Sequence, residues 1–128
     1  MPLVRIDVLE GRNGDEVRAV GEGVHRALIE AIGIPVLDRF QVITRHAPGH
    51  LIFDPENLDI PRTAGIVFVQ IVLTAGRTVQ QKRALYAAIV RHLGADPGVR
   101  PQDVFVNLVE VAKENWSFGN GAAQYAAE

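Results

Sequence analysis

The chain contains no cysteine, which excludes disulfides, thiolate metal sites and a cysteine nucleophile. It has no apolar run near the roughly 20 residues that a membrane-spanning helix needs. Arg5 and Asp7 interrupt the only apolar stretch near its start, so no signal peptide is expected. Neither sign of charge dominates: the formal net charge is -2, which gives no reason to expect nucleic acid or an anionic membrane as a partner. We therefore expect a soluble cytoplasmic protein.

The chain has 128 residues, of which 48% are hydrophobic and 22% are charged. This length and composition are typical of one globular domain with a hydrophobic core, so we expect residues 1–128 to form a single domain. Aromatic residues are scarce at 6%, yet the tail at 114–128 contains Trp116, Phe118 and Tyr125.

The first stretch of the chain is where we expect the chemistry. Val4, Ile6 and Val8 alternate with polar residues, which predicts a strand that begins at the terminus itself. Removal of an initiator methionine before a small residue is common, and it would leave Pro2 as a secondary amine held in the sheet. An α-amino group has a pKa of about 8 and burial disfavours its cation, so this amine could act as a base at neutral pH. The alternative interpretation is that Pro2 belongs to an unstructured end.

Hydrophobic periodicity predicts four strands and two helices. Asn13 with Glu16 marks the start of a helix and Gly33 its end, while Thr78 with Gln81 marks the start of the second helix. The expected elements are strands at 2–8, 39–44, 66–73 and 104–109 and helices at 14–32 and 78–93, with an irregular stretch at 46–63.

Some core positions can also be predicted. We expect Phe40 and Val42, with Ile43 as a further candidate, to be buried in the second strand. The apolar run at 66–73 predicts a strand covered on both faces. The expected apolar stripe of the second helix consists of Leu85, Tyr86, Ile89, Val90 and Leu93.

The two halves of the chain repeat. An offset of 65 residues relates 1–45 to 66–110 without a gap, and it pairs Val4 with Val69, Ile6 with Ile71, Gly11-Arg12 with Gly76-Arg77, Asp38 with Asp103 and Phe40 with Phe105. This repeat predicts an α+β fold in which two pseudo-symmetric β-α-β units share one four-stranded mixed sheet, with two helices on one face.

This architecture brings distant residues to one edge of the sheet. The strands of a β-α-β unit are parallel, so Asp38 should lie at the same edge as Pro2. A pseudo-twofold axis between the units would return the end of the third strand, with Arg77, to that edge. Arg77 also precedes a helix start, where unpaired N–H groups favour an anion. The opposite edge, with Arg12 and Asp103, has no amine and should be chemically silent.

In these residues and their arrangement, the chain resembles the tautomerase superfamily, whose members are built from β-α-β units and use an amino-terminal proline. It is most similar to the malonate semialdehyde decarboxylase branch, over essentially its whole length. The residues that carry the resemblance are Pro2-Leu3, Glu10-Gly11-Arg12, Asp38-Arg39-Phe40-Gln41, Gly76-Arg77, Gln81-Lys82 and the motif Trp116-Ser117-Phe118-Gly119-Asn120-Gly121.

The resemblance implies roles for particular residues. In that branch the proline, the aspartate that matches Asp38 and two arginines two residues apart are functional. Only the second arginine is present here, as Arg77; the first falls on Ala75, which favours tautomerisation over decarboxylation. The aromatic tail resembles an apolar pocket wall and suggests Trp116, Phe118 and Tyr125 as pocket lining. The resemblance also implies a homotrimer.

We therefore expect an enzyme for small oxo acids such as phenylpyruvate, with Pro2 as acid or base, Asp38 orienting substrate or water, and Arg77 binding the substrate carboxylate. The alternatives are a malonate semialdehyde decarboxylase and a trimeric binding module without turnover.

Structural roles compete with several of these assignments. Asp38 could cap a turn, Arg77 could be a solvated loop residue, and Trp116 and Phe118 could pack against a neighbouring chain. Arg39 is a candidate for binding the acid, but an ion pair with Asp38 or a surface partner is the simpler interpretation.

The histidines give no metal site. Pro48-Gly49 prevents His46 and His50 from lying on one helix, and His25 and His92 are expected on helix surfaces. We assign no metal and no cofactor.

Overall fold

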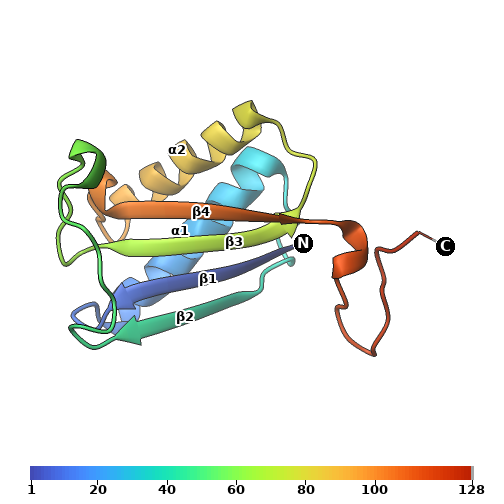
Figure 1. Ribbon diagram of the computed structural model, residues 1–128, viewed down its shortest axis with the longest axis horizontal. Helices are drawn as coiled ribbons and strands as arrows, with labels where there is room; N and C mark the ends of the chain where they lie inside the picture. The colour runs from blue at the N-terminus through green and yellow to red at the C-terminus, as the bar shows by residue number, and fades with distance from the viewer. Residues whose placement is uncertain (128) are drawn as a thin grey trace.

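The computed structural model describes residues 1–127. Its regular elements are β1 (Pro2–Leu9), α1 (Gly14–Ile32), β2 (Gln41–His46), β3 (Val67–Thr74), α2 (Val79–Ala95) and β4 (Val104–Val111). Single 3-10 turns lie at Asn57–Asp59, Pro101–Asp103 and Lys113–Asn115. The strands form one sheet in the order β2-β1-β3-β4, in which β1 is parallel to β2, antiparallel to β3, and β3 is parallel to β4 (Figure 1).

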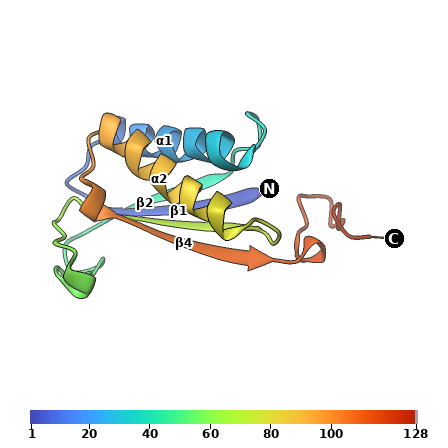
Figure 2. The same cartoon turned by 90° about the horizontal axis from the view of Figure 1, so that it is seen from above.

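Both helices cover the same face of this sheet (Figure 2). The core lies between the two layers and is built from alternate strand residues and the inner helix faces: Val4, Ile6, Val8, Val67, Val69, Ile71, Leu73, Val20, Val24, Leu28, Leu85, Ile89 and Leu93. Each of these side chains is at most 1% exposed. Burying a side chain of this size stabilises a fold by roughly 1.5–3 kcal/mol, so the alternation of apolar residues in β1 fixes which face meets the helices.

The predicted helix starts are confirmed. The Asn13 side chain accepts a hydrogen bond from the Glu16 backbone, and the Glu16 side chain accepts one from the Asn13 backbone. Thr78 and Gln81 form the same reciprocal pair at the start of α2. Gly33 ends α1 with a φ of 70°, a left-handed conformation that favours glycine.

The predicted repeat is visible in the strand register. In the first unit Val4 lies opposite Gln41, and in the second Val69 lies opposite Val106, so the same 65-residue offset relates both pairs. Arg5 and Gln70, which are repeat-mates, lie opposite each other in the antiparallel pair. A pseudo-twofold axis therefore passes between Arg5 and Gln70 and exchanges the two β-α-β units.

The sheet face opposite the helices is covered by no other layer among residues 1–127 (Figure 2). Within the described residues the strand at 66–73 is therefore covered on one face only. Gln70 is exposed on the open face, and Phe68 and Val72 are only half-buried there. β3 thus presents apolar side chains on both faces, one towards the helices and one on the open side.

Two other predicted core residues belong to this open side. Phe40 is 51% exposed and Val42 is 43% exposed, so their predicted burial is wrong. β2 begins at Gln41, so Phe40 precedes the strand, and Val42 points away from the helices because its neighbour Ile43 packs against the core.

The helices give two further corrections. His25 was expected on a helix surface but is buried, and its Nε2 lies 2.7 Å from the Val36 carbonyl oxygen, which satisfies the ring. Tyr86 is 37% exposed and does not belong to the buried stripe of α2, where Ala88 takes its place. Within residues 1–127 no helix is both long and apolar enough to span a membrane.

Candidate active site

The start of β1 and the turn before β2 bring Pro2 and Asp38 together. The Val4 N–H donates to the Phe40 carbonyl at 3.0 Å, which fixes the register of the two strands at this edge. A tight turn, in which the Asp38 N–H donates to Pro35, then places the Asp38 carboxylate beside the terminus. Asp38 Oδ2 lies 3.6 Å from the amino nitrogen of Met1.

This carboxylate is poorly satisfied for its burial. The Asp38 side chain is 12% exposed, and its Oδ1 has no hydrogen-bond partner among the described residues. A buried carboxylate oxygen without a partner costs free energy, so stability alone does not account for Asp38. Because the Asp38 carboxylate lies beside the amino terminus, it is suited to orient an ammonium, a water or a substrate.

A pocket of about 240 Å³ opens at this terminus. Its lining consists of Met1, Pro2, Leu3, Phe40, Trp116, Ser117 and Phe118. The predicted wall residues Trp116 and Phe118 therefore line the same pocket as Pro2. Phe40 completes the pocket although sequence periodicity assigned it to the core. While Met1 is attached, the Pro2 nitrogen is an amide and has no basic lone pair.

The tail that forms this wall is folded onto itself. Trp116 and Phe118 stack with ring centroids 5.5 Å apart, and Tyr125 meets Phe118 edge-on at 4.7 Å. Gln124 accepts a hydrogen bond from the Phe118 N–H and donates to the Gly119 carbonyl, both at 2.9 Å. Tyr125 therefore supports Phe118 from behind and does not itself line the pocket.

The turn in this tail explains part of its sequence motif. Gly119, Asn120 and Gly121 all have positive φ angles, at 133°, 59° and 65°. Such angles suit glycine and asparagine and disfavour other residues. The Gly119-Asn120-Gly121 segment is therefore needed to return the chain past Phe118.

Arg77 lies at the same end of the sheet but in a neighbouring hollow. This hollow, of about 320 Å³, is lined by Thr74, Ala75, Gly76, Arg77, Gln81 and Lys113. Arg77 Nη1 donates to the Thr74 carbonyl at 2.9 Å, and the Thr74 hydroxyl accepts from Trp116 Nε1 at 3.1 Å. Thr74 and Trp116 thus connect the hollow of Arg77 to the pocket of Pro2.

Arg39 is held away from the site. Its Nη1 donates to Glu22 on α1 at 2.6 Å, and it also contacts the Gln41 side chain. The Arg39 hydrogen bond, followed by that of Arg26, lowers the pKa of Glu22. The surface partner that the sequence left open is therefore Glu22, and Arg39 does not line the Pro2 pocket.

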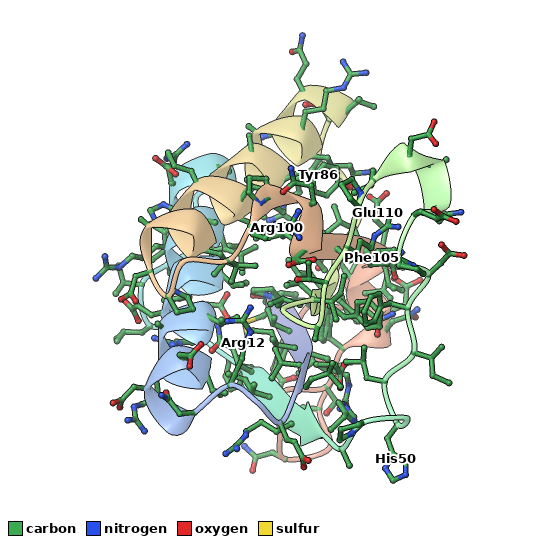
Figure 3. The ribbon with its side chains drawn as sticks, turned by 90° about the vertical axis from the view of Figure 1, so that its left-hand side faces the viewer. Arg12, His50, Tyr86, Arg100, Phe105 and Glu110 are labelled. Atoms are coloured by element: carbon green, nitrogen blue, oxygen red, sulfur yellow. The ribbon has the colours of Figure 1, made fainter. Side chains whose placement is uncertain are left out.

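The opposite end of the sheet carries Arg12 and Asp103, the repeat-mates of Arg77 and Asp38. Figure 3 looks onto this end, with Arg12 near its centre. Arg12 donates to Glu16 at 3.2 Å and to the Gly65 carbonyl at 2.5 Å. Asp103 is 1% exposed and accepts from the Thr63 N–H at 2.7 Å and from the Thr63 hydroxyl at 2.5 Å. These side chains are used for internal bonding.

Lys113 is a residue of this region that sequence reasoning missed. It follows β4, and the Ala75 N–H donates to the Val111 carbonyl at 2.9 Å, which holds the ends of β3 and β4 together. The parallel pairing of these two strands was predictable, and it places whatever follows β4 beside whatever follows β3.

Comparisons with known proteins identify the relatives of this fold. Two sequence families, both described as tautomerase enzymes, match residues 38–119 and residues 2–59. A probable tautomerase, YusQ, of Bacillus subtilis (strain 168) is 37% identical over 97% of this chain and 98% of its own length.

Solved structures that resemble this chain point to the same family. A malonate semialdehyde decarboxylase, FG41, inhibited by 3-bromopropiolate is 41% identical, covers 96% of this chain and 93% of its own, and superposes with a TM-score of 0.90. A fused 4-OT described as a symmetric trimer is 25% identical over 98% of this chain and 99% of its own, with a TM-score of 0.79. With the fold, the repeat and both family matches in agreement, the chain belongs to the tautomerase enzymes.

Proposed function

We propose that this enzyme interconverts the keto and enol forms of small 2-oxo acids such as phenylpyruvate, with Pro2 as its amino-terminal acid–base group after removal of Met1. The observation that carries the proposal is the placement of Asp38, whose carboxylate lies 3.6 Å from the terminal amine at an apolar pocket. After removal of Met1, the ring nitrogen of the buried Pro2 is the terminal amine, and Pro2 lines the same pocket.

The surroundings of Pro2 act on its amine in opposite directions. Burial disfavours the protonated amine, whereas the Asp38 carboxylate favours it. The free amine would take a proton from C3 of the oxo acid, and the C2 oxygen would then receive a proton to give the enol. The reverse steps return the keto acid.

In the proposed binding mode, the substrate spans the pocket at Pro2 and the hollow of Arg77. The aryl group packs against Trp116 and Phe118, and the carboxylate lies towards Arg77, whose guanidinium is suited to charge-assisted bonds with an acid. Asp38 orients the amine or a water.

The test is an assay of phenylpyruvate tautomerisation on protein whose intact mass shows that it starts at Pro2. Two controls accompany it: the same chain with Met1 retained, and Pro2→Ala. We expect loss of activity with Met1 retained, because the Pro2 nitrogen is then an amide, and a large decrease in Pro2→Ala. Full activity in the Met1-retaining chain would exclude Pro2 as the base.

A second candidate reaction is supported by a specific relative. The malonate semialdehyde decarboxylase that is 41% identical to this chain makes decarboxylation of a 3-oxo acid the main alternative. A protonated Pro2 would then polarise the carbonyl while carbon dioxide leaves. Ala75 is the argument against it, because one expected arginine is absent. Decarboxylation without any tautomerase activity would favour this alternative.

We also propose that the enzyme is a homotrimer. Its open sheet face carries Phe105 at 49% and Val109 at 38% exposure beside the half-buried Phe68 and Val72. Such a face on a soluble protein indicates an interface, and the number three comes from the fused 4-OT relative described as a symmetric trimer. Light scattering at micromolar concentration should give three times the chain mass, and Phe105→Glu should lower it; a wild-type monomer would contradict the assembly.

A further inference from the structure

The hollow beside the Pro2 pocket contains two cations from different parts of the fold. Arg77 comes from the connection between β3 and α2, and Lys113 comes from the turn after β4. The bond between Ala75 and Val111 brings these two segments together. Ala75, which is exposed and also lines the hollow, contributes only a methyl group there.

Neither cation is neutralised within the described part of the chain. The ion pairs among residues 1–127 include neither Arg77 nor Lys113. The nearby carboxylate, Glu110, pairs with Lys82 at 2.6 Å instead. The Lys82 hydrogen bond is the largest cause of the lowered pKa of Glu110, and the charge of Arg77 is the smallest.

The surrounding backbone strengthens the attraction for an anion. The hollow includes Gln81 in the first turn of α2, a helix of 17 residues. The positive end of the helix dipole therefore faces the same space as the two side chains. Two unpaired cations and a helix start therefore meet here from two segments of the chain, 74–81 and Lys113.

The hollow and the Pro2 pocket share a wall. Thr74 lines the hollow, Trp116 lines the pocket, and a hydrogen bond of 3.1 Å joins them. The two spaces are therefore neighbours, an arrangement that suits a molecule with an acid at one end and an apolar group at the other.

We propose that Lys113 is a substrate-binding residue, which together with Arg77 anchors the carboxylate of an aryl- or alkyl-substituted acid. This proposal rests on the proposed function for the identity of the site. Lys113 supplies the second positive charge that Ala75 does not provide. As a flexible point charge it attracts the acid without the paired geometry of an arginine.

Binding without turnover gives the direct test. Trp116 is the only tryptophan of the chain, so its fluorescence reports occupation of the wall between the two spaces. The probes are 3-phenylpropionate and its uncharged amide, which share the aryl group and differ in the charge. The variants are Lys113→Ala, Lys113→Arg and, as a matched control, Arg83→Ala, because Arg83 is exposed on α2 and lines neither space.

We expect Lys113→Ala to weaken binding of the acid by about 1.5- to fivefold, the range for one exposed charge pair, and to leave binding of the amide unchanged. Lys113→Arg should retain most of the wild-type affinity for the acid, and Arg83→Ala should bind both probes like wild type. Raising the salt concentration should narrow the gap between wild type and Lys113→Ala.

The outcomes separate this proposal from the proposed function. If wild type binds the acid through Lys113 but does not turn over phenylpyruvate, the anchor stands and the proposed reaction fails. If wild type turns over phenylpyruvate but Lys113→Ala keeps the wild-type affinity and KM, the anchor is overturned and the reaction stands. Equal weakening of acid and amide would also overturn it, because that result indicates a packing effect.

Discussion

Asp38 and Asp103 occupy equivalent positions in the two halves of the chain, yet only Asp103 is fully bonded. Thr63 donates two hydrogen bonds to Asp103, whereas Asp38 has a buried oxygen without a partner and a terminal amine at 3.6 Å. The same residue type thus serves the fold at one end of the sheet and is left available at the other. This asymmetry within a symmetric framework supports the proposal that the active end is the one with Asp38.

The first prediction compares the two aspartates by stability. Asp103→Ala removes two charge-assisted hydrogen bonds from a site that is 1% exposed, so we expect it to lower the free energy of unfolding by about 2–3 kcal/mol. Asp38→Ala makes the same change in volume but breaks no hydrogen bond, so its cost should be below about 1 kcal/mol. Urea unfolding of both variants measures the difference. Equal losses would show that Asp38 is a structural residue.

The second prediction compares the two arginines by binding. Arg77→Ala should raise the KM for phenylpyruvate by a factor corresponding to about 1.5–3 kcal/mol, since it removes a charge-assisted contact with the acid. Arg12→Ala should leave KM unchanged and lower stability instead, because Arg12 bonds to Glu16 and to the Gly65 carbonyl. Steady-state kinetics on both variants measures the two KM values. Similar increases in KM would contradict the assignment of the substrate site to the end of the sheet with Arg77.

The sequence was sufficient for the framework of this fold. The reciprocal caps of both helices and the repeat could be predicted because each depends on local hydrogen bonding or on a shared pattern of apolar residues. The meeting of Pro2 and Asp38 followed from the parallel order of β1 and β2 alone.

The side-chain details could not be predicted in the same way. Phe40 and Val42 are apolar, and periodicity does not distinguish the core face of an edge strand from an open face that is also apolar. Arg39 can reach more than one carboxylate, and its choice of Glu22 depends on the packing of α1 over β2. Lys113 belongs to no recognisable motif, and only the structure shows that it lines the same hollow as Ala75.

The third prediction concerns pH. Arg39 and then Arg26 hold the pKa of Glu22 below its ordinary value of 4.5. The stability gained from this carboxylate is therefore fully present above about pH 4.5 and is lost as the pH falls through the lower pKa of the folded state. The Glu22 side chain is 44% exposed, so the contribution should be at most about 1 kcal/mol.

Glu22→Gln provides the measurement. Urea unfolding should find it less stable than wild type at about pH 6, and the difference should be smaller at about pH 3, because Glu22 becomes protonated as the pH falls towards and through its folded-state pKa. A stability difference that is the same at both pH values would rule out the ion pair as its cause.

The last prediction asks what Ala75 contributes to the choice of reaction. Decarboxylation of malonate semialdehyde gives carbon dioxide and acetaldehyde, so the carboxylate must leave while the 3-oxo group is polarised. In the proposed binding mode Arg77 and Lys113 hold the carboxylate, and a cation at position 75, which lines the same hollow, would be available for the carbonyl. We expect Ala75→Arg to raise the ratio of decarboxylation to tautomerisation, in kcat/KM, by about tenfold or more.

The control for this experiment is Ala75→Gln, which adds a long polar side chain without the charge. Position 75 is exposed, so neither substitution should disturb the core. Acetaldehyde formation and phenylpyruvate tautomerisation are measured on the same preparations, confirmed to start at Pro2. If the arginine and glutamine variants change the ratio equally, the charge at position 75 does not select the reaction. If only the arginine variant changes it, the alanine of the natural chain is a determinant of tautomerase chemistry.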